Sequence, residues 1–110
     1  MTNPNTGCSR SRCVCPDTDL MAVLSSRYTL QLVCIVDAHG TARFSEFETH
    51  LPDASTSTLS ARLEALVDGG ILERTRYNEV PPRVEYELTR DGRGLARRAR
   101  SLLSWVDRHD

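Results

Sequence analysis

The spacing of apolar residues changes abruptly at Gly69-Gly70, and this change limits the folds open to the chain. Before the two glycines, apolar side chains recur at every third or fourth position from Leu59 to Val67, which predicts an amphipathic helix over residues 55–68. Ser55 is its predicted N-cap, because a serine hydroxyl at that place can accept a hydrogen bond from a free amide of the first turn. The paired glycines end this helix.

Two strands are predicted after the glycines. Residues 83–88 alternate between polar and apolar side chains, so the apolar ones share one face of a strand. Residues 71–77 are the predicted preceding strand. The segment 78–82 between them is too long and too rich in proline for a tight turn, and it is predicted to be the tip of a β-hairpin.

Helices are predicted on both sides of this region. The three on the N-terminal side cover residues 17–26, 28–38 and 43–51. The second is apolar on nearly every side, which is typical of a buried helix, and Gly40 is its predicted C-cap. A last helix follows its predicted N-cap, Thr89. We expect a flexible, cysteine-containing tail over 1–16 and, over 17–110, a mainly α domain with a two-stranded β-hairpin, arranged as a winged helix-turn-helix.

Length and composition favour one small globular domain. In the 110 residues no apolar run approaches the ~20 residues of a membrane span, and the N-terminal region lacks the apolar stretch of a secretory signal, so we expect a cytoplasmic protein with no membrane partner. The net charge of −1 gives little support to nucleic-acid binding, although all 14 basic residues are Arg, which suits bidentate contacts with phosphates. No histidine is spaced to pair with an acid or a nucleophile, so we expect no enzyme, no cofactor and no metal site.

Two segments resemble one family of regulators. Residues 69–95, GGILERTRYNEVPPRVEYELTRDGRGL, resemble the wing of the HxlR-type transcriptional regulators, a MarR-like winged-helix family with the pattern E-V-P-P-(R/K)-V-E-Y. Residues 43–66, RFSEFETHLPDASTSTLSARLEAL, are similar to the helix-turn-helix of that family, and Cys15-Pro16 matches the Cys-Pro with which many members open. The resemblance covers roughly residues 15–108. It implies a sequence-specific regulator that binds double-stranded DNA at a near-palindromic promoter site as a homodimer.

The chain departs from the family pattern at two places. Ser25-Ser26-Arg27-Tyr28 stands where Gly-Gly-Lys-Trp is common, which keeps the basic and aromatic characters and loses the glycines. Thr56, Ser57 and Thr58 follow the cap of the recognition helix, where the family often has Gln or Lys. The second departure weakens the electrostatic part of any DNA contact.

The predicted DNA interface combines the polar face of helix 55–68 with the hairpin. If the leucines of that helix face the core, its small side chains face away and let the backbone approach the major groove, while hairpin arginines reach the minor groove. Arg27 and Arg43 each begin a helix, where basic side chains commonly hold phosphates. The alternative is an ordinary surface helix beside a hairpin whose arginines pair with neighbouring glutamates. The predicted DNA-binding residues are Arg27, Tyr28, Arg43, Ser55, Thr56, Ser57, Thr58, Ser60, Ala61, Arg62, Arg74, Arg76, Asn78 and Arg83.

The last helix carries an apolar stripe that is longer than a small domain needs. We expect it to pair with the first helix in a dimer contact, which would place two recognition helices about 34 Å apart on successive turns of the major groove. The predicted interface residues are Leu20, Val23, Leu24, Leu95, Ala99, Leu102, Leu103 and Val106.

The four cysteines fall into two groups. Cys34 lies in the apolar helix, where packing in the core is expected. Cys15 precedes a helix start, whose dipole favours the thiolate, and the resemblance implies a redox- or electrophile-sensing role for it, with Cys8 and Cys13 as resolving thiols. Three alternatives stay open: inert thiols, a metal-responsive repressor that uses these thiols, and a protein-interaction module with the same fold and no DNA binding.

Overall fold

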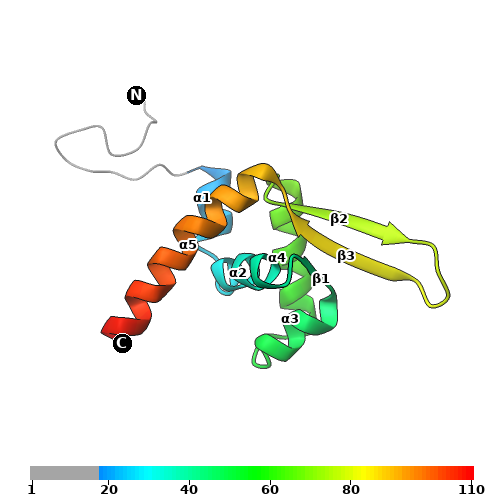
Figure 1. Cartoon of the computed structure of the whole chain (residues 1–110), viewed down its shortest axis with the longest axis horizontal. Helices are drawn as coiled ribbons and strands as arrows, with labels where there is room; N and C mark the ends of the chain where they lie inside the picture. The colour runs from blue at the N-terminus through cyan, green and yellow to red at the C-terminus, as the bar shows by residue number, and fades with distance from the viewer. Residues whose placement is uncertain (1–17) are drawn as a thin grey trace.

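The structure, a computed structural model, describes residues 18–110, and within them it forms five helices and a small sheet (Figure 1). The elements in chain order are α1 (Asp19–Leu24), α2 (Thr29–His39), β1 (Thr41–Ala42), α3 (Phe44–His50), α4 (Thr56–Asp68), β2 (Leu72–Tyr77), β3 (Arg83–Leu88) and α5 (Arg90–His109). The β2–β3 hairpin projects from one side of the helical body, and the C-terminal half of α5 projects from the other (Figure 1).

Helix α1 is shorter than the sequence predicts, because serine side chains end it. Thr18 caps the start, where its hydroxyl accepts a hydrogen bond from the Met21 amide at 3.1 Å. At the other end the hydroxyls of Ser25 and Ser26 donate to carbonyls of the last turn, at 2.8 Å to Met21 and 3.0 Å to Ala22. Such bonds compete with continuation of the helical ladder.

Helix α2 is the centre of the core. Leu32, Val33 and Val36 are completely buried in it, which confirms the prediction of a buried helix. It ends at Gly40, whose φ of 77° lies in the left-handed region that glycine adopts without strain, so the predicted C-cap is confirmed.

The α3–α4 pair forms the helix-turn-helix. The Ser55 hydroxyl accepts a hydrogen bond from the Thr58 amide at 3.1 Å, which confirms the predicted N-cap of α4. Helix α4 buries Leu59, Leu63 and Leu66, the positions that its apolar period predicts. The opposite face of α4 is therefore turned away from the core.

The predicted two-stranded hairpin is present as β2–β3, and a short third strand extends it to an antiparallel sheet in the order β1-β3-β2. The added strand, β1, pairs Ala42 with Tyr86. Two residues are too few to show a period in the sequence, and β1 is held by its pairing with β3 and by the burial of Ala42. The predicted β3 is confirmed over all six residues.

Helix α5 begins at the predicted cap and is divided into a packed half and an exposed half. The Thr89 hydroxyl accepts from the Gly92 amide at 3.0 Å and lies 2.6 Å from the Gly70 carbonyl oxygen, to which it donates. A Cβ at Gly92 would lie 2.1 Å from the Ile71 carbonyl oxygen, so only glycine fits this crossing. Beyond the buried Ala99 the helix leaves the body. Within residues 18–110, no helix is both long and apolar enough to span a membrane.

Candidate DNA interface

The outer face of α4 is polar, uncharged and accessible over its first two turns. Thr56, Ser57, Ser60 and Ala61 are all exposed, as the leucine period requires. The Thr56 hydroxyl lies 3.4 Å from a carboxylate oxygen of Glu48 on α3, and the Ser57 hydroxyl lies 3.3 Å from that of Ser55. Small side chains on an exposed helix face leave room for close approach to a groove.

Ser55 and Thr58 are used within the fold. The Ser55 hydroxyl caps α4 and also lies 2.9 Å from the Thr58 hydroxyl, to which it donates. Thr58 is half-buried. Both residues therefore fix the start of α4, and Thr56, Ser57, Ser60 and Ala61 are the predicted contact residues whose side chains are exposed on this helix.

An acidic residue that the sequence analysis did not include lies on the same face of α4. Glu64 follows Ser57 by seven positions, and its carboxylate accepts a hydrogen bond from Nη1 of Arg74 on β2 at 2.8 Å. Hydrogen bonding to Glu64, and then to Tyr86, raises the pKa of Arg74 above its ordinary value. The charge of Arg74 is thus balanced by a helix carboxylate. Only the packing of β2 beside α4 reveals this pair, since the two residues lie ten positions apart across a turn.

The strand register separates the three hairpin arginines into two faces. Arg74 lies opposite Tyr86 and Arg76 opposite Val84, so both arginines are on the face of the sheet that meets the core. Arg83 is on the reverse face, opposite Tyr77. The three predicted hairpin arginines therefore do not share one surface.

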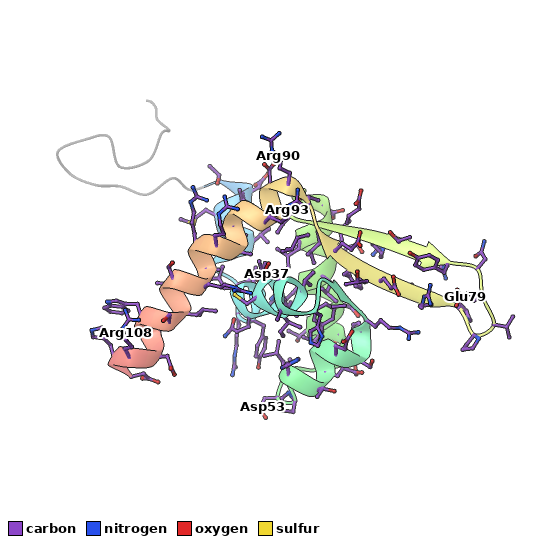
Figure 2. All side chains as sticks on the ribbon, viewed as in Figure 1. Asp37, Asp53, Glu79, Arg90, Arg93 and Arg108 are labelled. Carbon is purple, nitrogen blue, oxygen red and sulfur yellow. The ribbon has the colours of Figure 1, made fainter. Side chains whose placement is uncertain are left out.

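Arg83 is held inside the wing. Its guanidinium lies 3.3 Å from a Glu79 oxygen and 3.2 Å from a Glu85 oxygen, and 4.2 Å from the centre of the Tyr77 ring. Glu79 lies at the outer end of the hairpin, far from the helical body (Figure 2). Arg76, by contrast, is exposed and forms no ion pair within the described part of the chain, and Asn78 at the tip is also exposed.

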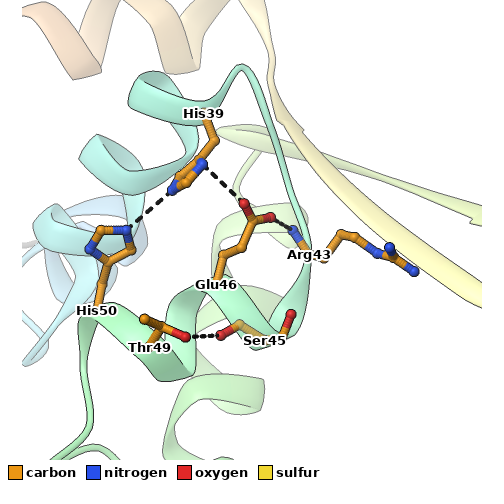
Figure 3. A network of polar contacts seen from close by, with 6 residues as sticks. All are labelled: His39, Arg43, Ser45, Glu46, Thr49 and His50. Atoms are coloured by element: carbon orange, nitrogen blue, oxygen red, sulfur yellow. Dashed lines mark hydrogen bonds and ion pairs between the residues drawn. The ribbon is translucent and has the colours of Figure 1, made fainter.

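The remaining basic residues differ in how free they are. The Arg62 side chain donates from Nε to the Arg27 carbonyl oxygen at 3.1 Å, so it ties α4 to the segment that precedes α2. The Arg27 guanidinium lies 4.7 Å from the Tyr28 ring centre, and Tyr28 has a φ of 76°. The Arg43 backbone amide donates to the Glu46 carboxylate at 2.7 Å, and the Arg43 side chain points away from that carboxylate (Figure 3).

Two histidines that are eleven positions apart lie side by side, where α2 and α3 end (Figure 3). His39 Nδ1 lies 3.0 Å from a Glu46 oxygen, and His39 Nε2 lies 3.2 Å from His50 Nε2. The expectation that no histidine pairs with an acid is therefore wrong, because the turn at Gly40 and β1 folds α3 back beside the end of α2. Among residues 18–110 there is no group of three or more His, Cys, Asp or Glu side chains placed to hold a metal ion.

The cysteine predictions are mostly outside this structure. Cys8, Cys13 and Cys15 precede the described residues. Cys34 is a free thiol on α2, half-buried rather than enclosed in the core. Burial raises its pKa, Asp37 adds to that rise, and Arg100 opposes it.

The apolar residues of α1 and α5 line an open groove. Its volume is about 340 Å³, and its walls include Met21, Leu24, Leu95 and Leu102. Of the predicted interface residues, Ala99 is only 3% exposed, and Val23 and Leu95 pack against the core, so these three are largely used within the subunit. The large apolar residues left exposed on α1 and α5 are Leu20, Leu102 and Val106 from the predicted set, together with Met21 and Trp105, which were not predicted.

A helix-turn-helix followed by a β-hairpin and a long terminal helix defines the winged helix-turn-helix class of proteins. Residues 23–110 match the model of the HxlR-like helix-turn-helix family, and the chain belongs to this family. It is a transcriptional regulator of HxlR type and not an enzyme.

Individual relatives agree with this assignment. The chain is 32% identical over 93 residues to the uncharacterized HTH-type transcriptional regulator YtfH of Escherichia coli, with 84% of this chain and 73% of the relative covered. The structure of the putative regulator ytfH from Salmonella typhimurium is similar with a TM-score of 0.76 at 31% identity, over 84% of this chain and 82% of that one. The redox regulator HypR in its oxidized form is similar with a TM-score of 0.72 at 31% identity, over 80% and 90%.

Proposed function

We propose that this regulator binds a near-palindromic promoter site on double-stranded DNA as a homodimer. The exposed face formed by Thr56, Ser57, Ser60 and Ala61 would enter the major groove, and the wing would follow the backbone to the adjacent minor groove. The observation that carries the proposal is this face: it is accessible and uncharged, and it lies on the second helix of a helix-turn-helix. A protein of this function works beside the chromosome, so we place it in the cytoplasm.

The proposed dimer rests on the exposed half of α5. Leu102 is 49% exposed, Trp105 52% and Val106 41%, which is a large apolar surface for one short stretch of helix. The groove between α1 and α5 continues this surface. A two-fold contact here would cover it and would hold two α4 helices for successive turns of the groove.

The charges available for phosphates are few. Arg27, Arg43 and Arg76 are exposed and form no ion pair within residues 18–110, whereas Arg74 and Arg83 are paired with carboxylates. Three arginines per subunit would neutralise about six phosphates per dimer, which gives a slope of log affinity against log salt of about −5. Base contacts by hydroxyl groups would supply the sequence preference.

The test is DNA binding measured by fluorescence anisotropy with a fragment from upstream of the gene of this protein. Arg76→Ala is expected to weaken binding to every sequence alike and to flatten the salt slope by about 2 per dimer. Ser57→Ala and Ser60→Ala are expected to change the ranking of operator variants instead. Arg90→Ala is the matched control, since Arg90 begins α5 and lies across the domain from α3 (Figure 2). Equal losses for Arg76→Ala and Arg90→Ala would refute the interface.

The proposed input is oxidation at Cys15, with Cys8 or Cys13 as the second thiol. Two thiols would join in a disulfide while an external oxidant such as diamide takes up the two electrons and two protons. The similarity to a redox regulator supports this role. Diamide is expected to change operator affinity of the wild type and to leave that of Cys15→Ser unchanged. Native mass spectrometry that instead finds a metal on these thiols would refute it.

A further inference from the structure

The cluster of His39, Glu46 and His50 has no part in the proposed DNA contact, and its geometry is unusual for a surface (Figure 3). The two imidazoles come from the C-terminal ends of different helices, His39 from α2 and His50 from α3. Their rings lie edge to face at an interplanar angle of 67°, and the Nε2 atoms face each other at 3.2 Å. The two atoms that approach each other are therefore both imidazole nitrogens, a type of atom that binds transition metals.

This separation is that of an N–H···N hydrogen bond between the two rings, and it is also that of two nitrogens on one metal ion. Zn²⁺ binds imidazole nitrogen at about 2.0–2.1 Å in tetrahedral geometry, which puts two bound nitrogens about 3.3 Å apart. The rings need to move little to receive an ion between them. Both histidines are exposed, so water can complete the coordination sphere.

Glu46 occupies the place of a positioning carboxylate behind a metal-binding histidine. One of its oxygens lies 3.0 Å from His39 Nδ1, and the other accepts the Arg43 amide at 2.7 Å, so the carboxylate is fixed at both ends. A proton on Nδ1 that is donated to Glu46 leaves the lone pair of His39 on Nε2, the atom that faces His50. This arrangement of carboxylate, histidine and metal fixes both the tautomer and the ring orientation.

We propose that His39 and His50 form a two-histidine site for a divalent transition-metal ion such as Zn²⁺, with Glu46 as the residue that positions His39. The ion would join the end of α2 to the end of α3, and so would fix the first helix of the helix-turn-helix against the core. The proposed ligands include no thiol.

The test is a titration of the full-length, ¹⁵N-labelled protein with ZnCl₂ at pH 7.5, followed by the imidazole nitrogen signals. This measurement resolves each histidine and so distinguishes zinc bound at this site from zinc bound by any of the four cysteines. With Zn²⁺ in excess over the thiols, the Nε2 signals of His39 and His50 are expected to shift together and to saturate at one concentration. His109, at the end of α5, is the internal reference and is expected not to follow them.

Variants distinguish zinc bound by both histidines together from zinc bound by a single exposed histidine. His50→Gln is expected to weaken zinc binding at His39 at least tenfold, and His109→Gln to leave it unchanged. Glu46→Gln has one acceptor oxygen where the carboxylate has two, so it cannot accept from both His39 Nδ1 and the Arg43 amide; it is expected to weaken zinc binding about tenfold with an unchanged circular dichroism spectrum. The proposal is overturned if excess Zn²⁺ leaves the His39 and His50 signals in place, or if His39 in the His50→Gln variant binds zinc as in the wild type.

Discussion

Removal of one negative charge from α4 is expected to strengthen DNA binding. Glu64 lies on the exposed face of the recognition helix and holds Arg74 at 2.8 Å. In a complex the carboxylate would stand near phosphates, and it also occupies an arginine that could reach one. Glu64→Gln removes the charge, keeps the shape of the side chain, and reduces the contact with Arg74 to a neutral hydrogen bond, which a DNA phosphate can displace.

The magnitude follows from the number of charges. One freed arginine per subunit adds two neutralised phosphates per dimer, so the slope of log affinity against log salt becomes steeper by about 1.8. Between 50 and 200 mM salt, the variant would lose about twelvefold more affinity than the wild type loses. Its advantage in affinity is therefore largest at low salt.

The assay is fluorescence anisotropy with one operator fragment over 50–200 mM KCl. Glu73→Gln is the matched control, because Glu73 makes the same change in net charge from the reverse face of the hairpin, opposite Glu87. An equal gain in both variants would show a long-range effect of net charge alone. An unchanged slope in Glu64→Gln would refute the argument that Arg74 is held away from phosphate.

Three further predictions concern the wing, the dimer and the core. Arg83→Ala is expected to lower the melting temperature and to leave the salt slope of DNA binding nearly unchanged, because Glu79 and Glu85 already neutralise Arg83; a slope as flat as that of Arg76→Ala would contradict this. Leu102→Glu is expected to give monomers in sedimentation equilibrium while Ser101→Glu, on the exposed side of the same helix, keeps dimers; dimers in both would remove α5 from the interface. Thr89→Ala is expected to cost about 1 kcal/mol in denaturant unfolding, since it deletes the N-cap of α5, and a change within a few tenths of a kcal/mol would refute that role.

Local signals allowed the elements to be predicted from the sequence. The N-caps at Ser55 and Thr89, the glycine at position 40 and the leucine period of α4 each act within a few residues, so they can be read without the fold. Strand β1 could not be predicted in this way, because two residues show no period and are held only by pairing with β3.

The candidate site was less predictable, because its pairings join distant segments. The sequence shows which arginines lie on the hairpin, but the register decides that Arg83 faces away from Arg74 and Arg76. The contacts of Glu64 with Arg74 and of His39 with Glu46 depend on how α4 meets β2 and how α3 folds back on α2. The sequence therefore shows how many arginines the chain has, and only the structure shows which of them are unpaired and could contact phosphates.

This distribution of charges explains how a chain with a net charge of −1 can serve as a DNA-binding regulator. The reverse face of the wing carries Glu73, Glu85 and Glu87 with Arg83 as its one arginine, so its charge is net negative, while Arg76 stands on the other face without an acid partner among the described residues. A small set of free arginines gives weak, sequence-independent attraction to phosphates. Under the proposed function, the hydroxyl-bearing face of α4 would then supply a large share of the binding energy, through contacts that only matched base pairs provide. Such a regulator would discriminate its operator from other DNA through low background binding.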